Sequence, residues 1–185
     1  MKITQDFFIN KNTLEIAEKL IGKVLVYETN EGILKGIINE TEAYTQEDPA
    51  SHSYMGKITQ RNKTMFKRYG HLYVYFTYGM YHCINIVTEK ENIGSAVLVR
   101  SLIPIEGKEI MIKNRKGNIK NLTNGPGKIS LAFNFNKELN GTDLLKPNSK
   151  IYLLDENCKP KNIKKTERIG ISKGKKYLWR FVGTF

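Results

Sequence analysis

The sequence predicts an α+β protein: a single domain whose curved, largely antiparallel sheet carries a protruding β-hairpin and is surrounded by helices. The chain has 185 residues, of which 40% are hydrophobic and 26% charged. That length is enough to bury one hydrophobic core without disulfides or metals. β-rich runs follow one another across short turn signals, and helical periodicity appears between them. This alternation of hairpins and helices is typical of the α+β class.

The N-terminal part predicts one helix, one hairpin and one loop. Residues 10–22, NKNTLEIAEKLIG, begin a helix with Asn12 as N-cap and Glu15 three residues later, the signature of a capping box. Residues 23–44 form two β-rich runs joined at Asn30-Glu31-Gly32, and the second run ends in ETEAY. The polar residues 45–56, TQEDPASHSYMG, predict an irregular loop.

A tyrosine-rich hairpin dominates the centre of the chain. After a short predicted helix at 59–68, residues 71–87, HLYVYFTYGMYHCINIV, predict two strands that turn near Tyr78-Gly79-Met80. Four tyrosines and one phenylalanine lie within positions 73–81. These rings either form the core of the sheet, where each hydroxyl needs a partner, or a platform on which a base can stack.

The C-terminal half predicts shorter elements. Residues 95–102, SAVLVRSL, predict a buried strand closed by Pro104, and residues 106–115 predict a helix. A basic, glycine-rich loop at 116–128 leads into a predicted helix at 129–135, ISLAFNF. Three late strands are expected over KIYLLD, ERIGIS and WRFVG, at 150–155, 167–172 and 179–183.

The charge balance points to a polyanionic partner. Thirty Lys and Arg residues against 18 Asp and Glu give a net charge of +12. Such a surface attracts nucleic acid, although a basic surface can also serve only to keep a protein dissolved. Cys83 and Cys158 show no paired spacing, which indicates a reducing, cytoplasmic compartment. No secretory signal and no run of about 18 apolar residues is present, so no membrane association is expected.

The chemistry-bearing residues do not predict a metal or a cofactor. His52, His71 and His82 lack ligand spacing, and neither a phosphate-binding loop motif nor a dinucleotide fingerprint occurs. Glu42 is a candidate catalytic carboxylate, although a single carboxylate at a strand end is most often a solvated surface residue. Tyr78, at the predicted turn, is either covered by another loop or presented outward as a wedge between base steps.

Three long segments carry a family resemblance. They are residues 38–66, INETEAYTQEDPASHSYMGKITQRNKTMF, then 69–87, YGHLYVYFTYGMYHCINIV, and 95–107, SAVLVRSLIPIEG. Their order and spacing closely resemble the alkyladenine (3-methyladenine) DNA glycosylase family, of the monofunctional single-domain type. The similarity extends to DFFINKNTLEIAEKLIGKVLV near the start, to TNGPGKISLAF, and to RIGISKGKKYLWRF near the end.

The resemblance implies a base-excision-repair enzyme. Such an enzyme flips alkylated or deaminated purines out of double-stranded DNA and hydrolyses the N-glycosidic bond, leaving an abasic site. Residues 1–185 would form a single catalytic domain that acts as a monomer, without a cofactor and without lyase activity. Two departures bear on the substrate range: the 44–52 loop is one residue shorter than in vertebrate members, and KKYLWRF lacks the proline often found before its Arg-Phe pair.

The resemblance also assigns roles to individual residues. Glu42 matches the general base that activates water. The flipped base would stack between Tyr44 and His52 on one side and Tyr75 on the other, and electron-rich rings favour a cationic purine by roughly 0.5–2 kcal/mol per contact. Asn85 matches a residue that crowds the exocyclic amino group of guanine.

Three further roles concern the DNA. Tyr78 matches the residue that inserts into the duplex in place of the extruded nucleotide. Arg100 matches an arginine that contacts a phosphate, and the backbone N–H of His52 is an expected donor to the bound base. Two other functions stay open on the sequence alone: a non-catalytic nucleic-acid-binding module, which would have no use for a carboxylate at position 42, and an RNA-directed hydrolase.

Overall fold

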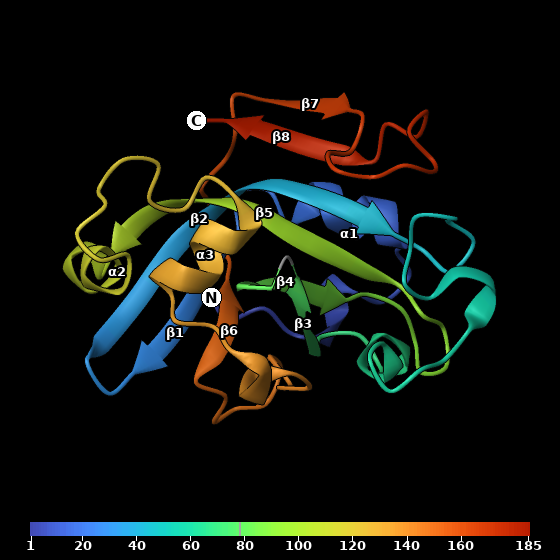
Figure 1. The fold of residues 1–185 in the computed structure, drawn as a ribbon, viewed down its shortest axis with the longest axis horizontal. Helices are drawn as coiled ribbons and strands as arrows, with labels where there is room; N and C mark the ends of the chain where they lie inside the picture. Colours follow the sequence, from blue (N-terminus) through green and yellow to red (C-terminus); the bar gives the residue numbers. More distant parts are fainter. Residues whose placement is uncertain (78) are drawn as a thin grey trace.

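The chain folds around one antiparallel sheet, which the computed structural model describes for residues 1–77 and 79–185 (Figure 1). Within these residues eight strands pair in the order β3-β4-β5-β2-β1-β6, while β8 pairs with both β2 and β7. The predicted α+β class with a largely antiparallel sheet is confirmed. The strands are β1 (Val24–Thr29), β2 (Gly32–Tyr44), β3 (Leu72–Thr77), β4 (Tyr81–Val87), β5 (Ala96–Glu106), β6 (Ile151–Leu154), β7 (Asn162–Thr166) and β8 (Arg180–Thr184).

Three α-helices, in the same described residues, pack against this sheet (Figure 1). The first lies against β2 and β5, the third against β4 and β5, and the second contacts β2 and the third helix. Their bounds are α1 (Thr13–Lys19), α2 (Lys108–Asn114) and α3 (Pro126–Ala132). Short 3-10 turns occupy η1 (Gln5–Phe7), η2 (Tyr54–Gly56), η3 (Lys63–Phe66) and η4 (Lys137–Leu139).

The start of α1 confirms the predicted capping box. The Asn12 side chain accepts a hydrogen bond from the Glu15 N–H at 3.0 Å, and the Glu15 carboxylate accepts one from the Asn12 N–H at 2.8 Å. Two backbone donors that the first helical turn leaves free are thereby paired. The helix packs its apolar face, including Ala17 and Leu20, into the main core.

Strand β2 curves the sheet because it exchanges partners along its length. Its first half pairs with β1, its second half pairs with β8 at 40–42, and β5 runs along its other edge. The register with β5 shifts around Glu40. Irregularities of this kind bend a strand and increase its twist. The bend lies directly before Glu42 and Tyr44.

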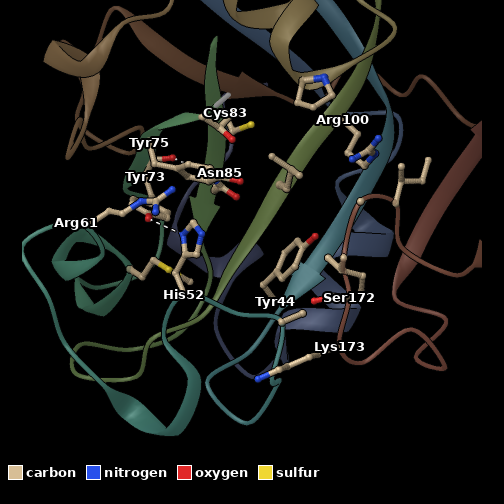
Figure 2. Close-up of a pocket in the computed structure, with 18 of the residues that line it drawn as sticks. Tyr44, His52, Arg61, Tyr73, Tyr75, Cys83, Asn85, Arg100, Ser172 and Lys173 are labelled. Carbon is tan, nitrogen blue, oxygen red and sulfur yellow. Dashed lines mark hydrogen bonds between the residues drawn. The ribbon is translucent and has the colours of Figure 1, made fainter. Parts of the chain in front are cut away.

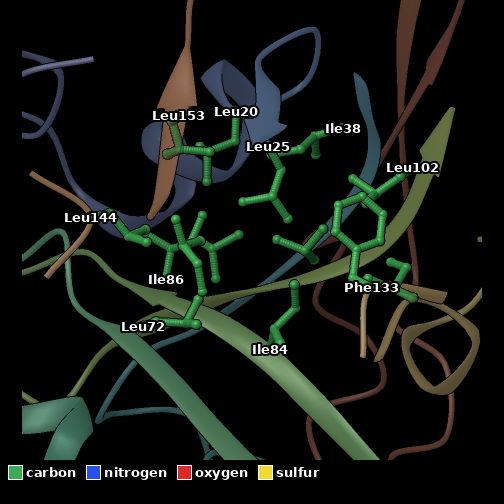
Figure 3. Close-up of a cluster of buried hydrophobic side chains, with 14 of the residues drawn as sticks. Leu20, Leu25, Ile38, Leu72, Ile84, Ile86, Leu102, Phe133, Leu144 and Leu153 are labelled. Atoms are coloured by element: carbon green, nitrogen blue, oxygen red, sulfur yellow. The ribbon is translucent and has the colours of Figure 1, made fainter. Parts of the chain in front are cut away.

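One hydrophobic core fills the space between the sheet and the helices (Figure 3). Leucine and isoleucine side chains from β1, β2, β3, β4 and β6 meet those of α1 and Phe133 there. Ten of these side chains are labelled in Figure 3: Leu20, Leu25, Ile38, Leu72, Ile84, Ile86, Leu102, Phe133, Leu144 and Leu153.

The β3–β4 hairpin places its tyrosines on the side away from this core. Leu72 and Val74 belong to the main core, whereas Tyr73 belongs to a second cluster with Tyr75 packed against it. This alternation follows from the two-residue period of a strand. Tyr73 is almost fully buried and acts as core, and Tyr75 stands at the edge of the second cluster. The core interpretation is therefore confirmed for Tyr73, and the platform interpretation of Tyr75 stays a prediction.

Two expectations for the middle of the chain are wrong. Residues 59–68 form only the short turn η3, because the Asn62 side chain bonds to the loop before it instead of pointing outward from a helix. Strand β5 does not end before Pro104 but continues to Glu106. Strand β4 pairs with β5 only at residues 96–98, so among the described residues no strand lies beside Pro104 on that edge of β5. On the other edge Pro104 pairs with Gly36, next to a register shift.

Two more corrections concern the C-terminal half. Helix α3 begins at Pro126 rather than at Ile129, with proline in its first turn, where the missing N–H costs nothing. Residues 167–172 form no strand; the strand is β7, directly before them. The Arg168 side chain and the Ile169 N–H instead bond to carboxylates in the interior. The other predicted helices and strands are confirmed within a few residues at their ends, and no helix among the described residues is long and apolar enough to cross a membrane.

Replacing Asn12 by alanine should lower the free energy of unfolding by about 1 kcal/mol, because the Glu15 N–H loses its acceptor. Urea denaturation followed by circular dichroism measures this. Asn12→Ser restores an acceptor of similar reach and should recover most of the loss. Equal destabilisation by both variants would mean that the cap contributes nothing.

Candidate active site

A cavity of about 470 Å³ opens between the β3–β4 hairpin, the ends of β2 and β5, and the segment 169–173 (Figure 2). It collects residues from six separate stretches of the chain. The lining comprises Tyr44, Pro49, Ala50, His52, Arg61, Met65, Tyr73, Tyr75, Thr77, Cys83, Asn85, Leu98, Arg100, Pro126, Ile169, Gly170, Ile171, Ser172 and Lys173.

Glu42 lies beneath this cavity with no exposed side-chain surface. Its Oε2 accepts a hydrogen bond from the Tyr44 hydroxyl at 2.8 Å, and its Oε1 accepts one from the Ile169 N–H at 2.8 Å. The Arg100 Nε stands 3.4 Å from Oε1. Hydrogen bonds and an adjacent cation stabilise a buried carboxylate in its charged form. The geometry therefore holds an oriented carboxylate next to the cavity.

Arg100 is part of a network of charges behind Glu42. Its Nε donates to Glu40 Oε1 at 2.8 Å, and the Arg180 Nε donates to the same oxygen at 2.6 Å. The neighbouring carboxylates raise the pKa of Arg100 despite its burial. Arg100 lines the cavity, as a phosphate-contacting residue must, but its Nε is already engaged by carboxylates.

Tyr44 forms one wall of the cavity. Its hydroxyl is committed to Glu42, and burial together with the Glu42 charge raises the pKa of that hydroxyl well above its usual range. The hydroxyl is thus a fixed donor at neutral pH. A rigid ring with its edge tied to the carboxylate can present a flat face to a ligand.

A buried Arg168–Asp48 pair supports this wall, and sequence reasoning does not reveal it. The guanidinium bonds to both Asp48 oxygens, one of them at 3.0 Å, and donates to the Ala43 carbonyl at 2.9 Å. Its Cζ lies 4.6 Å from the centre of the Tyr44 ring and 5.2 Å from that of Trp179. Both side chains of the pair are fully buried. The two residues lie 120 positions apart, so no local pattern in the sequence indicates this pairing.

His52 and Tyr75 form the opposite wall together (Figure 2). Their ring centres are 4.6 Å apart with the planes at 75°, and His52 Nδ1 shares a 2.9 Å hydrogen bond with the Tyr73 hydroxyl. The expectation that His52 stands with Tyr44, facing Tyr75, is therefore wrong: the imidazole packs against Tyr75. Burial raises the pKa of Tyr73 to about 12, and burial followed by the Arg61 charge lowers the pKa of His52.

The loop carrying His52 is held by Asn62. The Asn62 amide donates to the carbonyls of His52 and Lys57 at 2.6 and 2.8 Å, and its oxygen accepts from the Thr59 N–H at 2.7 Å. Within residues 1–77 and 79–185, the His52 N–H itself has no hydrogen-bond acceptor. The backbone of His52 is thus held through its carbonyl while its N–H stays available, which is compatible with the donor role expected for this N–H.

Asn85 and Cys83 line the floor between the walls. The Asn85 amide donates to the Tyr73 carbonyl across the hairpin at 3.1 Å, which fixes its orientation. Cys83 lies opposite Tyr75 in the strand register, and burial raises the pKa of its thiol. A raised thiol pKa reduces the thiolate fraction at neutral pH, which does not favour Cys83 as a nucleophile.

Of the residues singled out in the sequence, Glu42, Tyr44, His52, Tyr75, Asn85 and Arg100 come together around this one cavity. Tyr78 lies outside the described residues. Among those that are described, no group of three His, Cys, Asp or Glu side chains is arranged to hold a metal ion.

The sequence matches the family model described as methylpurine-DNA glycosylase over residues 7–184. The chain belongs to the methylpurine-DNA glycosylase family. Members of this family are DNA-repair enzymes that hydrolyse N-glycosidic bonds. The cavity with its buried carboxylate is therefore the candidate active site of a DNA glycosylase.

Relatives of this glycosylase cover nearly its whole length. A protein of Clostridium novyi (strain NT) is 43% identical over 98% of this chain and 94% of its own length. One from Francisella tularensis subsp. tularensis is 46% identical over 91% of this chain and 89% of its own. A third, from Desulfitobacterium hafniense (strain Y51), is 42% identical over 94% of this chain and 91% of its own length. Each bears the name "Putative 3-methyladenine DNA glycosylase".

Replacing Asp48 by alanine should destabilise the protein by about 3–5 kcal/mol, because the Arg168 guanidinium is then buried without its counter-charge. The double variant Asp48→Leu with Arg168→Met removes both charges and should recover most of this loss. Urea unfolding of the three proteins measures the effect. A single variant as stable as the wild type would show that the pair does not hold this region together.

Proposed function

We propose that residues 1–185 form one monofunctional catalytic domain that flips alkylated or deaminated purines out of double-stranded DNA and hydrolyses their N-glycosidic bond. The observation that carries this proposal is the buried, hydrogen-bonded Glu42 next to a cavity with aromatic walls. In this proposal the protein acts as a monomer in the cytoplasm. The product of the reaction is an abasic site, and no lyase step follows.

Glu42 acts as the general base in this proposal. Its two oxygens accept hydrogen bonds from Tyr44 and Ile169, and each keeps a further lone pair for a water proton. The same negative charge stabilises the oxocarbenium-like sugar as the base departs. The fixed donors keep the carboxylate in one orientation, so that no reorganisation is needed during the reaction.

The base-binding role of the cavity rests on its two walls. The purine lies between Tyr44 on one side and the Tyr75–His52 pair on the other, a modification of the expected grouping that follows from the contact between these rings. Asn85, held by the Tyr73 carbonyl, meets the purine edge and rejects guanine through its exocyclic amino group. Arg100 contacts the phosphate next to the flipped nucleotide, with the guanidinium nitrogens that Glu40 does not use.

The positive surface brings the enzyme to DNA. A net charge of +12 gives a long-range attraction to the phosphates that is independent of sequence. Tyr78 then takes the place of the extruded nucleotide as an intercalating residue, an assignment that rests on its match to the family sequence and on its sequence position in the segment 71–87.

Glu42→Gln should abolish the release of free 3-methyladenine and 7-methylguanine from alkylated duplex DNA while DNA binding is retained, because an amide cannot accept the water proton. Chromatography of the released bases and a parallel binding assay test this. Glu47→Gln, an exposed charge change in the following loop, is the matched control and should leave release unchanged. Release by Glu42→Gln would remove Glu42 as base, and binding without release by the wild type would favour a binding module. Ribo-substrates in the same assay test the RNA-directed alternative.

Tyr78→Ala should reduce discrimination between damaged and undamaged duplexes more than it reduces binding to undamaged DNA, because the extruded state loses the ring that fills the vacated space. The ratio of the two Kd values, measured by fluorescence anisotropy at one salt concentration, reports this. Phe76→Ala removes another, exposed ring from the same hairpin and serves as control. An unchanged ratio for Tyr78→Ala would contradict the wedge role.

A further inference from the structure

Both aromatic walls of the cavity already face an arginine. The Arg168 Cζ lies 4.6 Å from the centre of the Tyr44 ring, and the Arg61 Cζ lies 5.3 Å from that of Tyr75. Both distances fall inside the range of about 6 Å in which a cation is attracted to a ring. The rings that would favour a cationic purine therefore each interact with a cation of the protein.

The two arginines differ in how their charge is balanced. Arg168 is buried and paired with Asp48. Arg61 is exposed, lines the cavity, and has no carboxylate within 4.0 Å in the described part of the chain. Its only hydrogen bond there is a long one of 3.5 Å to the Phe76 carbonyl. Arg61 thus brings an unbalanced positive charge to the wall that Tyr75 forms (Figure 2).

The charge of Arg61 acts on the neighbouring groups of the cavity. After burial, it is the second cause that lowers the pKa of His52. It also opposes the rise in the pKa of Tyr73 that burial produces. A cation that disfavours a protonated imidazole at this wall disfavours a protonated or alkylated purine there for the same reason.

We propose that Arg61 is a specificity-determining residue that occupies the cation–π position on Tyr75 and thereby reduces the advantage of cationic bases over neutral ones. This inference rests on the proposed glycosylase function. Because Arg61 lines the same cavity as Tyr75, a positively charged 7-methylguanine that stacks on this ring is repelled by the guanidinium. Neutral hypoxanthine stacks on the same ring without that repulsion. The pocket is thereby matched to neutral deaminated purines as well as to alkylated ones.

Arg61→Gln and Arg61→Lys test the inference as a pair. The first removes the charge and the second keeps it, and because Arg61 is exposed neither should disturb the fold. Release of 7-methylguanine and of hypoxanthine is measured at pH 6.5 from duplexes identical except for the lesion. We expect the ratio of the two kcat/KM values, 7-methylguanine over hypoxanthine, to rise about two- to fivefold in Arg61→Gln. Arg61→Lys should stay near the wild-type ratio.

Using the ratio separates this role from DNA backbone binding. A lost phosphate contact would lower both rates by the same factor and leave the ratio unchanged, and that result would overturn the proposal. NMR titration of His52 without DNA gives a second readout, independent of activity. The pKa of His52 should rise in Arg61→Gln, and an unchanged value would refute the electrostatic basis. A wild type that releases 3-methyladenine but neither of these two bases would overturn the substrate preference alone, whereas absence of release of all three bases would refute the glycosylase function.

Discussion

The Glu42 carboxylate is fully buried, and a buried charge left without partners would cost several kcal/mol of folding free energy. The surrounding structure meets this constraint with one hydroxyl, one backbone N–H and one guanidinium, contributed by Tyr44, Ile169 and Arg100. These groups come from β2, from the segment after β7 and from β5. Compensating one carboxylate therefore requires three parts of the chain to meet, and their meeting point is the edge of the cavity.

A buried ion pair between Arg168 and Asp48 fixes the structure around Glu42. Arg168 connects the end of β2, through the Ala43 carbonyl, to the loop at Asp48 and to the Gly174 carbonyl. The guanidinium stacks between Tyr44 and Trp179, so the same side chain that joins the loops also supports a wall of the cavity. A bidentate guanidinium is suited to this because its planar donors satisfy several acceptors in fixed directions. The position of the loops, the support of the Tyr44 ring and the charge balance of Arg168 thus depend on one another.

The sheet provides the rigid part of the site. Strand β2 bends where it exchanges partners, directly before Glu42, and the β3–β4 hairpin presents alternate side chains to two sides. One side completes the main core, which holds the hairpin in place, and the other carries Tyr73 and Tyr75. Tyr73 then orients His52 through its hydroxyl. The Glu42 carboxylate and the rings of Tyr44 and Tyr75 are consequently placed by strands, and loops, including the one that carries His52, complete the cavity.

Local rules of sequence were sufficient for α1 with its capping box, for the two hairpins and for the α+β class, because each depends on residues near one another in the chain. The resemblance added a set of site residues, six of which line or underlie one cavity. Tertiary structure alone decided the rest. The Arg168–Asp48 pair joins residues 120 positions apart. Because Arg168 points into the interior to form this pair, the segment 167–172 connects the loops instead of forming the expected strand. The packing of His52 on Tyr75, and of Arg61 over that ring, arises from a loop folded by Asn62. Such contacts have no local signature, since their energy comes from burial and charge balance between distant segments.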